Sequence, residues 1–223
     1  MAQAFPFDAV IFDMDGVIVD TERYYADELR VMSDTFGMHI TDAEIFGQVG
    51  MSNQDFKRHL VMWWGRAGRT YTGEEALAAY QEWAATRHCD YASLLNPGVP
   101  ETIAALKQRG VRVALASSSP IDNIKHVLSV CGLADAFEII VSGEQFKQSK
   151  PDPEIYLHTL DLLGLPASRC CCVEDSKFGI EAGKRAGLTV IAKREDRFGF
   201  SQAEADYIVD TVPEVLSLPV SHR

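Results

Sequence analysis

The chain has 223 residues, of which 47% are hydrophobic, so it can bury a large core. Its 16 glycines and 9 prolines are ordinary in number, which excludes disordered, collagen-like and fibrous proteins. The formal net charge of −11 argues against a nucleic-acid or anionic-membrane partner, because no basic stripe accompanies it. A phosphorylated substrate stays compatible with this charge, since one metal ion and one lysine can reverse the local field.

The first sixteen residues, MAQAFPFDAVIFDMDG, lack the basic region and the uninterrupted apolar run of a signal peptide. No stretch reaches the ~18 uncharged apolar residues that a membrane-spanning helix needs. Three of the five cysteines, Cys170, Cys171 and Cys172, are consecutive, so on a strand they point to alternate faces and suit neither disulfides nor zinc. We therefore predict a soluble cytoplasmic protein whose cysteines are small buried hydrophobes.

The first predicted strand, Ala9–Phe12, leads directly into Asp13 and Asp15, which lie one residue apart and precede Gly16. Buried strands rarely contain carboxylates, and two close carboxylates repel each other unless a cation lies between them. The pair indicates either a strand that runs out into solvent or a site that needs two negative charges.

Residues 21–92 differ from the rest because they contain helical patterns only, with glycine-marked joints between them. All three tryptophans, Trp63, Trp64 and Trp83, fall in this stretch and predict a small hydrophobic core of its own. We predict that residues 21–92 form an all-helical domain, inserted into an α/β core domain made of residues 1–20 and 93–223.

Outside this insertion, short continuous apolar runs alternate with helical patterns that end at glycines, which is typical of parallel strands covered on both faces. The predicted fold is therefore α/β, with a doubly wound, mostly parallel, Rossmann-like sheet. The predicted strands are Ala9–Phe12, Val111–Ala116, Ile139–Val141, Cys170–Val173, Thr189–Ala192 and Tyr207–Val209. The predicted helices are about 100–110, 121–132, 153–164 and a last one that stops at Gly187.

Polar residues follow several of these strands, at the edge where ligands bind in open parallel sheets. Ser117 and Ser118 follow the second strand, Lys150 lies in the loop after the third, and Glu174 and Asp175 follow the fourth. Each has a simpler explanation, because aspartates form turns, serines cap helices, acids complement helix N-termini and lysines are solvated. Their joint presence at one edge favours a single chemistry.

Phosphoryl transfer through a carboxylate fits these groups. An aspartate is ionised at neutral pH and needs no base to become a nucleophile. Repulsion between Asp13 and an anionic phosphate would be offset by Mg²⁺, which prefers the oxygen ligands that Asp13, Asp175 and Glu174 can supply.

The remaining groups have complementary roles in such a site. Asp15 could protonate the leaving group and later activate water. Gly16 would permit an unusual turn or a close backbone approach. Ser117 and Lys150 would hold the oxygens of the transferring group.

Four stretches, FDMDGVIVDTE, LASSS, SKPDPEIY and VEDSKFGIEAGKRAG, resemble in order the four motifs of the haloacid dehalogenase-like (HAD) superfamily, and the resemblance covers the whole chain. It implies a Mg²⁺ cofactor and a phosphoaspartate intermediate. The roles it implies are Asp13 as nucleophile, Asp15 as acid and base, Ser117, Ser118 and Lys150 as phosphate holders, and Asp13, Asp175, the Asp15 carbonyl and Glu174, direct or through water, as metal ligands.

The helical insertion resembles the cap of the subgroup that includes β-phosphoglucomutases and small sugar phosphatases. That resemblance implies a cap that closes over the site, with Asp20 and Thr21 in its hinge. The mutases carry a histidine where this chain has Tyr25 and an arginine where it offers Asn53, so cations for a second phosphate are missing and a phosphatase is favoured. The other cap cations, which could contact a substrate or form a solvated face, are Lys57, Arg58 and Arg87.

We therefore predict a monomeric, Mg²⁺-dependent phosphatase acting on a small phosphorylated metabolite of the sugar phosphate class. The runner-up is a β-phosphoglucomutase-like mutase primed by a bisphosphate. Dehalogenases and phosphonate hydrolases of the superfamily are disfavoured, because both lack the second aspartate of the first motif. The non-enzyme alternative is a receiver-like phospho-switch domain, but receivers lack a cap and place their phosphorylated aspartate on a later strand.

Overall fold

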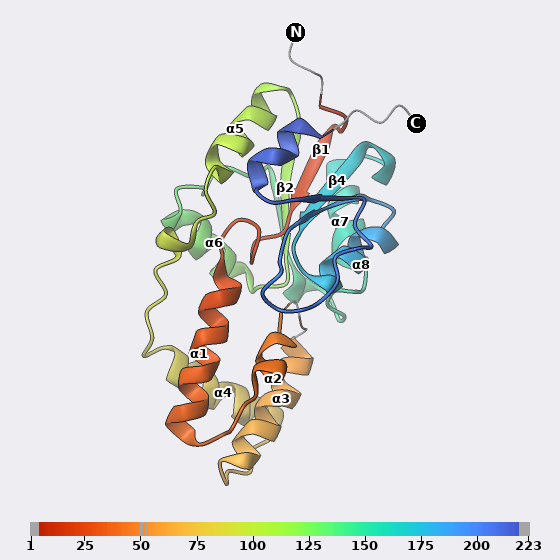
Figure 1. The fold of residues 1–223 in the computed structure, drawn as a ribbon. Coiled ribbons are helices and arrows are strands. Elements are labelled where there is room, and N and C mark those ends of the chain that lie inside the picture. Colours follow the sequence, from red (N-terminus) through yellow and green to blue (C-terminus); the bar gives the residue numbers. More distant parts are fainter. Residues whose placement is uncertain (1–4, 50, 52, 219–223) are drawn as a thin grey trace.

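The computed structural model describes residues 5–49, 51 and 53–218, and its centre is a six-stranded parallel sheet with helices on both faces (Figure 1). The strand order is β3-β2-β1-β4-β5-β6. The predicted fold class is confirmed, and each predicted strand forms within one residue of its expected ends. The strands are β1 (Ala9–Phe12), β2 (Arg112–Ser117), β3 (Ile139–Ser142), β4 (Cys170–Glu174), β5 (Thr189–Lys193) and β6 (Tyr207–Val209).

Register brings the polar strand ends together. Phe12 at the end of β1 pairs with Leu115 of β2 and with Val173 of β4, so the three central strands finish almost level. The Asp13 amide then donates to the Val173 carbonyl at 3.0 Å, which continues the ladder one step beyond β1. Residues after β1, β2 and β4 consequently meet at the carboxyl edge of the sheet.

The two faces of the sheet are covered by different helices. Helices α5 (Val99–Gln108) and α6 (Ile121–Val130) pack on one face, and α7 (Glu154–Leu163) and α8 (Lys177–Arg185) pack on the other. The consecutive cysteines of β4 are free and fully buried, with Cys171 in one apolar cluster and its two neighbours in the other. The prediction of small buried hydrophobes is confirmed for this strand.

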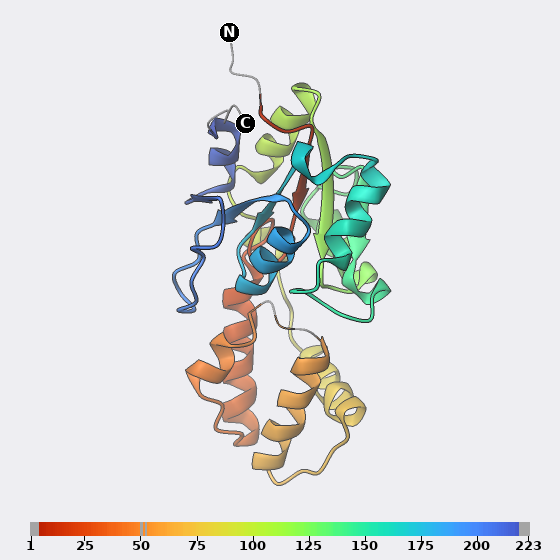
Figure 2. The ribbon, with the colours of Figure 1, turned by 90° about the vertical axis from the view of Figure 1, so that its right-hand side faces the viewer.

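A group of helices between β1 and α5 lies beyond the carboxyl edge of the sheet (Figures 1 and 2). Trp63 and Trp64 are buried in its separate hydrophobic cluster and Trp83 packs against that cluster, as predicted. None of the helices within the described ranges is long and apolar enough to cross a membrane. This helical segment comprises α1 (Thr21–Phe36), α2 (Asp42–Phe46), α3 (Asn53–Arg66) and α4 (Gly73–Ala84).

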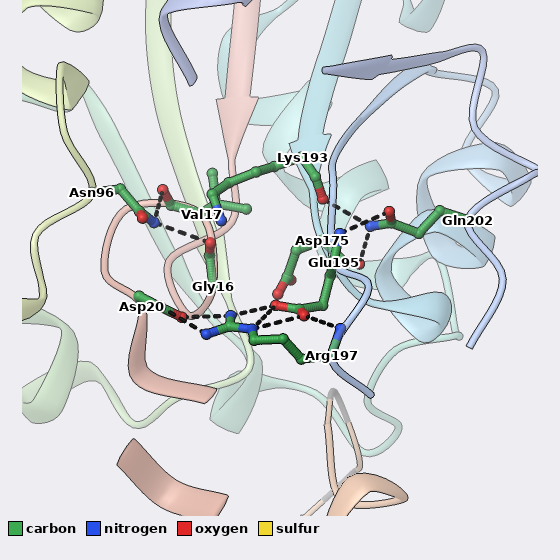
Figure 3. A network of polar contacts seen from close by, with 9 residues as sticks. All are labelled: Gly16, Val17, Asp20, Asn96, Asp175, Lys193, Glu195, Arg197 and Gln202. Atoms are coloured by element: carbon green, nitrogen blue, oxygen red, sulfur yellow. Dashed lines mark hydrogen bonds and ion pairs between the residues drawn. The ribbon is translucent and has the colours of Figure 1, made fainter. Parts of the chain in front are cut away.

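The two connections to the helical segment run side by side. The Asp20 amide donates to the Leu94 carbonyl at 2.8 Å, and the Asn96 amide donates to the Ile18 carbonyl at 2.9 Å. The Asn96 side chain also donates to the carbonyls of Gly16 (3.1 Å) and Val17 (2.8 Å), as Figure 3 shows. The chain therefore leaves and re-enters the α/β part through two adjacent segments that are hydrogen-bonded to each other.

Candidate active site

A cavity of about 340 Å³ lies between the carboxyl edge of the sheet and the helical segment. The helical segment contributes a wall that is partly aromatic and carries neutral polar groups, including Tyr25, Gln48, Tyr80 and Gln81. The side chains from the α/β part that line it include Asp13, Asp15, Ser118, Ser119, Lys150 and Asp175.

Lys150 is the centre of a buried ionic cluster at this edge. Its Nζ lies 2.6 Å from Asp13 Oδ1, 2.6 Å from Glu174 Oε1 and 3.2 Å from the Ala116 carbonyl oxygen. The Tyr156 hydroxyl donates to the same Glu174 oxygen, and the Tyr156 ring centroid lies 5.0 Å from Nζ. Burial alone lowers the pKa of Lys150, but Asp13 and Glu174 raise it further than burial lowers it, so the lysine stays charged.

The buried environment of Asp13 holds more negative charge than Lys150 compensates. Burial raises the pKa of Asp13, Lys150 opposes this effect, and Glu174 and Asp15 add to it, with a net upward shift. The lysine alone therefore does not balance the surrounding carboxylates. A divalent cation would lower this pKa and favour the carboxylate.

Asp15 lies in a different environment from Asp13. Its two oxygens accept hydrogen bonds from Thr21 Oγ1 at 2.7 Å and from Ser119 Oγ at 2.9 Å. Burial raises its pKa, and these hydroxyls lower it by a smaller amount. A buried carboxyl group with a raised pKa is suited to donating and accepting protons.

A metal ion fits the carboxylates next to Lys150. One oxygen each of Asp13, Glu174 and Asp175 lies within 4.8 Å of the others, and all three residues are buried. Asp175 Oδ2 is buried without a hydrogen-bond partner, as expected of an oxygen that faces a cation site. Glu174 is more fully engaged, since its second oxygen accepts from the Asp175 amide and Ser176 Oγ.

Gly16 makes room for this arrangement. Its φ of +79° is in the left-handed region, and a Cβ there would lie 1.8 Å from Asp175 Oδ2. Gly16→Ala therefore forces the carboxylate of Asp175 to move. We expect this variant to need much more Mg²⁺ for half-maximal phosphate release than the wild type.

Gly110→Ala is the matched control for this prediction. Gly110 has nearly the same φ, +76°, but nothing lies within 4 Å of a Cβ placed on it. Both variants should lose about 1–2 kcal/mol of stability through the left-handed backbone. Equal Mg²⁺ requirements in the two variants, measured beside their melting temperatures, would show that the contact with Asp175 is unimportant.

The predicted phosphate-holding serines occupy different positions. Ser117 ends β2 fully buried, and its Oγ accepts from the Ser119 amide at 3.1 Å, whereas Ser118 lines the cavity. The simpler explanation of the serines as helix caps is wrong, because Pro120 is the N-cap of α6 and the Ile121 amide donates to the Glu144 carboxylate instead of to a serine.

The hinge and cap candidates are only partly gathered at the cavity. Thr21 is fully buried against Asp15, and Asp20 lies outside the cavity, where it binds Arg197. Tyr25 lines the cavity, with its hydroxyl 3.2 Å from that of Tyr91. Asn53 begins α3, but its side chain is outside the described part of the structure.

The cap cations proposed as alternative substrate contacts are paired within the helical segment. Lys57 binds Glu74 at 2.7 Å, Arg58 binds Asp55, and Arg87 binds Glu28 at 2.7 Å. None of these three cations lines the cavity, where Lys150 is the only basic residue among the described lining residues. The interpretation as a solvated face is therefore the one the structure supports.

Three residues at the site received no role from the sequence. Ser119 holds Asp15, and only its place in the serine run hinted at this. Tyr156 supports Glu174 and belongs to SKPDPEIY. Glu22 lines the cavity, and burial together with Asp15 and Asp13 raises its pKa well above the usual value.

The model of the haloacid dehalogenase-like hydrolases matches residues 7–187 of this chain. The chain belongs to this family. The phosphorylated carbohydrates phosphatase of Thermotoga maritima is 33% identical over 81% of this chain and 82% of its own length. The beta-phosphoglucomutase of Bacillus subtilis is 28% identical over 96% of this chain and 94% of its own length.

A solved structure has the same fold as this chain. The crystal structure of CbbY from Rhodobacter sphaeroides in complex with phosphate has a TM-score of 0.75 and 24% identity to this HAD-like hydrolase, over 95% of this chain and 100% of that one, which shows a shared fold. The predicted family and its subgroup of sugar phosphatases and β-phosphoglucomutases are thus confirmed, and the protein is an enzyme of the hydrolase class.

Proposed function

We propose that this HAD-like hydrolase is a Mg²⁺-dependent phosphatase that acts on a small phosphorylated metabolite of the sugar phosphate class. The observation that carries this proposal is a pair of unlike aspartates at one cavity, where Asp13 is bound to Lys150 and Asp15 is held by two hydroxyl groups. A relative that is 33% identical over 189 aligned residues is named as a phosphatase of phosphorylated carbohydrates.

In the first step, Asp13 is the nucleophile. Lys150 occupies its Oδ1, which leaves Oδ2 to form a bond to phosphorus. The bond between phosphorus and the ester oxygen breaks, and Asp15 gives its proton to that oxygen. The products are the free alcohol and a phosphoryl group covalently bound to Asp13.

In the second step, Asp15 acts as the base. Its carboxylate takes a proton from a water molecule, whose oxygen attacks phosphorus while the bond to Asp13 breaks. Inorganic phosphate leaves, and both aspartates return to their starting states. Lys150 and the serines next to the cavity would hold the phosphoryl oxygens through both steps.

Asp13 and Asp175 would hold the Mg²⁺ ion, with Glu174 and the Asp15 carbonyl as further expected ligands. The ion would offset the repulsion between the phosphate and the nucleophilic carboxylate. The orphaned oxygen of Asp175 supports this assignment.

The charges of the cavity favour a phosphatase over a mutase. Its described lining includes four carboxyl groups but only one basic side chain, that of Lys150. The carboxyl groups belong to Asp13, Asp15, Glu22 and Asp175. A bisphosphate intermediate would leave its second phosphate without a cation.

The helical segment, residues 21–92 with Asp20 and Thr21 at its hinge, would act as the cap of a cytoplasmic monomer.

A phosphate-release screen over a few dozen phosphorylated metabolites tests this proposal. We expect Mg²⁺-dependent release from one or more sugar phosphates and loss of release in EDTA. The screen includes β-glucose 1-phosphate with and without glucose 1,6-bisphosphate. Conversion to glucose 6-phosphate only when the bisphosphate is present would instead identify a mutase, and release that survives EDTA would contradict the metal dependence.

A further inference from the structure

The loop after β5 connects the hinge of the helical segment to the predicted metal site. It spans residues 194–202 and is called the Arg197 loop here. Arg197 binds Asp20 with two contacts, from Nη1 to Oδ2 at 2.9 Å and from Nη2 to Oδ1 at 2.7 Å (Figure 3). Two parallel N–H···O contacts of this kind fix the relative orientation of both side chains.

Arg197 is held on its other side by Glu195. Its Nε lies 2.8 Å and 3.0 Å from the two carboxylate oxygens, and Nη2 also contacts Glu195. Glu195 is only 3% exposed, and Arg197 is the cation that its buried carboxylate contacts. An isolated surface ion pair contributes little to the free energy of unfolding. A network of ion pairs with a buried member can nevertheless fix the orientation of the side chains in it.

Gln202 fastens the same loop to the metal-site wall. Its Nε2 donates to the Asp175 carbonyl at 2.6 Å and to the Lys193 carbonyl at 2.8 Å, and its Oε1 accepts from the Glu195 amide at 3.0 Å. Gln202 is itself buried. Figure 3 shows this path from Asp20 through Arg197 and Glu195 to Gln202 and Asp175.

The hinge end of this path leads to the predicted acid and base. Asp20 is followed by Thr21, whose hydroxyl donates to Asp15 at 2.7 Å. Phe198, which follows Arg197 in the loop, belongs to the apolar cluster of the helical segment. Its ring centroid lies 5.4 Å from that of Phe46 in α2. The Arg197 loop thus contacts Asp20 at the hinge, the carbonyl of Asp175 at the predicted metal site, and the helical segment.

We propose that Arg197 is a positioning residue that sets Asp15 relative to Asp175 by clamping Asp20. Release of the clamp lets Asp20 and Thr21 shift, so that Asp15 loses its alignment with the leaving-group oxygen. This inference rests on the proposed phosphatase function. It assigns a catalytic effect to a residue that lies outside the cavity lining.

The test compares leaving groups. The value of kcat/KM reports on steps up to the breaking of the ester bond, and an alkyl phosphate needs a general acid there more than p-nitrophenyl phosphate does. We expect Asp20→Asn and Arg197→Gln to lower kcat/KM for a sugar phosphate roughly tenfold to hundredfold through this misalignment, and to change kcat/KM for p-nitrophenyl phosphate little. Arg197→Lys should be intermediate, because lysine cannot form the double contact.

Arg194→Gln is the matched control, since Arg194 lies in the same loop and forms an exposed ion pair with Asp210 at 2.6 Å. This variant should leave kcat/KM unchanged for both substrates. Asp20→Asn leaves the Arg197–Glu195 pair intact, so it remains informative if Arg197→Gln fails to fold. The double variant Asp20→Asn/Arg197→Gln should have a kcat/KM no lower than that of the less active single variant, because both substitutions remove the same contact.

Amide hydrogen exchange at residues 18–22 gives a readout that does not depend on activity. We expect faster exchange in Asp20→Asn than in the wild type and in Arg194→Gln. Unchanged exchange, or an equal loss of kcat/KM for both substrates, would overturn the clamp. A wild-type protein that hydrolyses no phosphate ester would refute the proposed function, while the exchange result would still decide whether Arg197 holds the hinge.

Discussion

Asp13→Asn abolishes phosphate release from both sugar phosphates and p-nitrophenyl phosphate. The asparagine amide is not a nucleophile, so the loss should be roughly 10⁴-fold or more, as for other covalent catalysts that lose their nucleophile. Asp210→Asn, at an exposed ion pair far along the chain, is the control and should keep full activity. Substantial turnover by Asp13→Asn would exclude a phosphoaspartate on this residue.

The pH dependence of unfolding shows whether this variant is folded. Because burial raises the pKa of Asp13, the folded metal-free protein retains a proton that the unfolded chain has released. Its stability therefore falls as pH rises from the usual aspartate pKa towards the raised one. Asp13→Asn has no such proton, so in EDTA its melting temperature should decline less over that range than that of the wild type.

Asp15→Asn slows turnover without removing the nucleophile. The expected loss is ~10²–10⁴-fold, the usual contribution of a general acid or base. An asparagine oxygen can still accept from Thr21, so the hinge contact and the fold should persist. The first step should suffer more with sugar phosphates than with p-nitrophenyl phosphate, measured as kcat/KM, because nitrophenolate leaves without protonation.

A variant with an unchanged rate would remove Asp15 from the mechanism. Asp122→Asn, in the first turn of α6, is a suitable control because Asp122 is close in sequence to the lining residues Pro120 and Asn123 but does not itself line the cavity. Together, the two aspartate variants separate the attack on phosphorus from proton transfer.

The strands of this enzyme were predictable because their signals are local. Each consists of a continuous apolar run, and glycines such as Gly110 and Gly164 mark the helix ends between them. Parallel register then places the residues after β1 and β4 at one edge, so that Asp13 and Asp175 could be expected to meet.

Other parts of the site depend on contacts that no local pattern specifies. Three consecutive serines stand at the end of β2, and only the bend of the chain decides that Ser119 meets Asp15 while Ser117, the last residue of the strand, is buried in the interior. Arg197 binds Asp20 across 177 residues of sequence. Such long-range polar contacts arise from the assembled fold, and a single sequence offers no periodicity that identifies them.

The paired connections at Val19 and Leu95 have an evolutionary consequence. These two residues form an antiparallel bridge, so the chain departs for the helical segment and returns at almost the same point. The α/β part can therefore keep its hydrogen bonds whatever length of chain lies between Thr21 and Leu94, because the hydroxyl that holds Asp15 already belongs to Thr21. The wall that the helical segment contributes to the cavity can therefore vary in evolution while Asp13, Asp15 and Lys150 keep their positions.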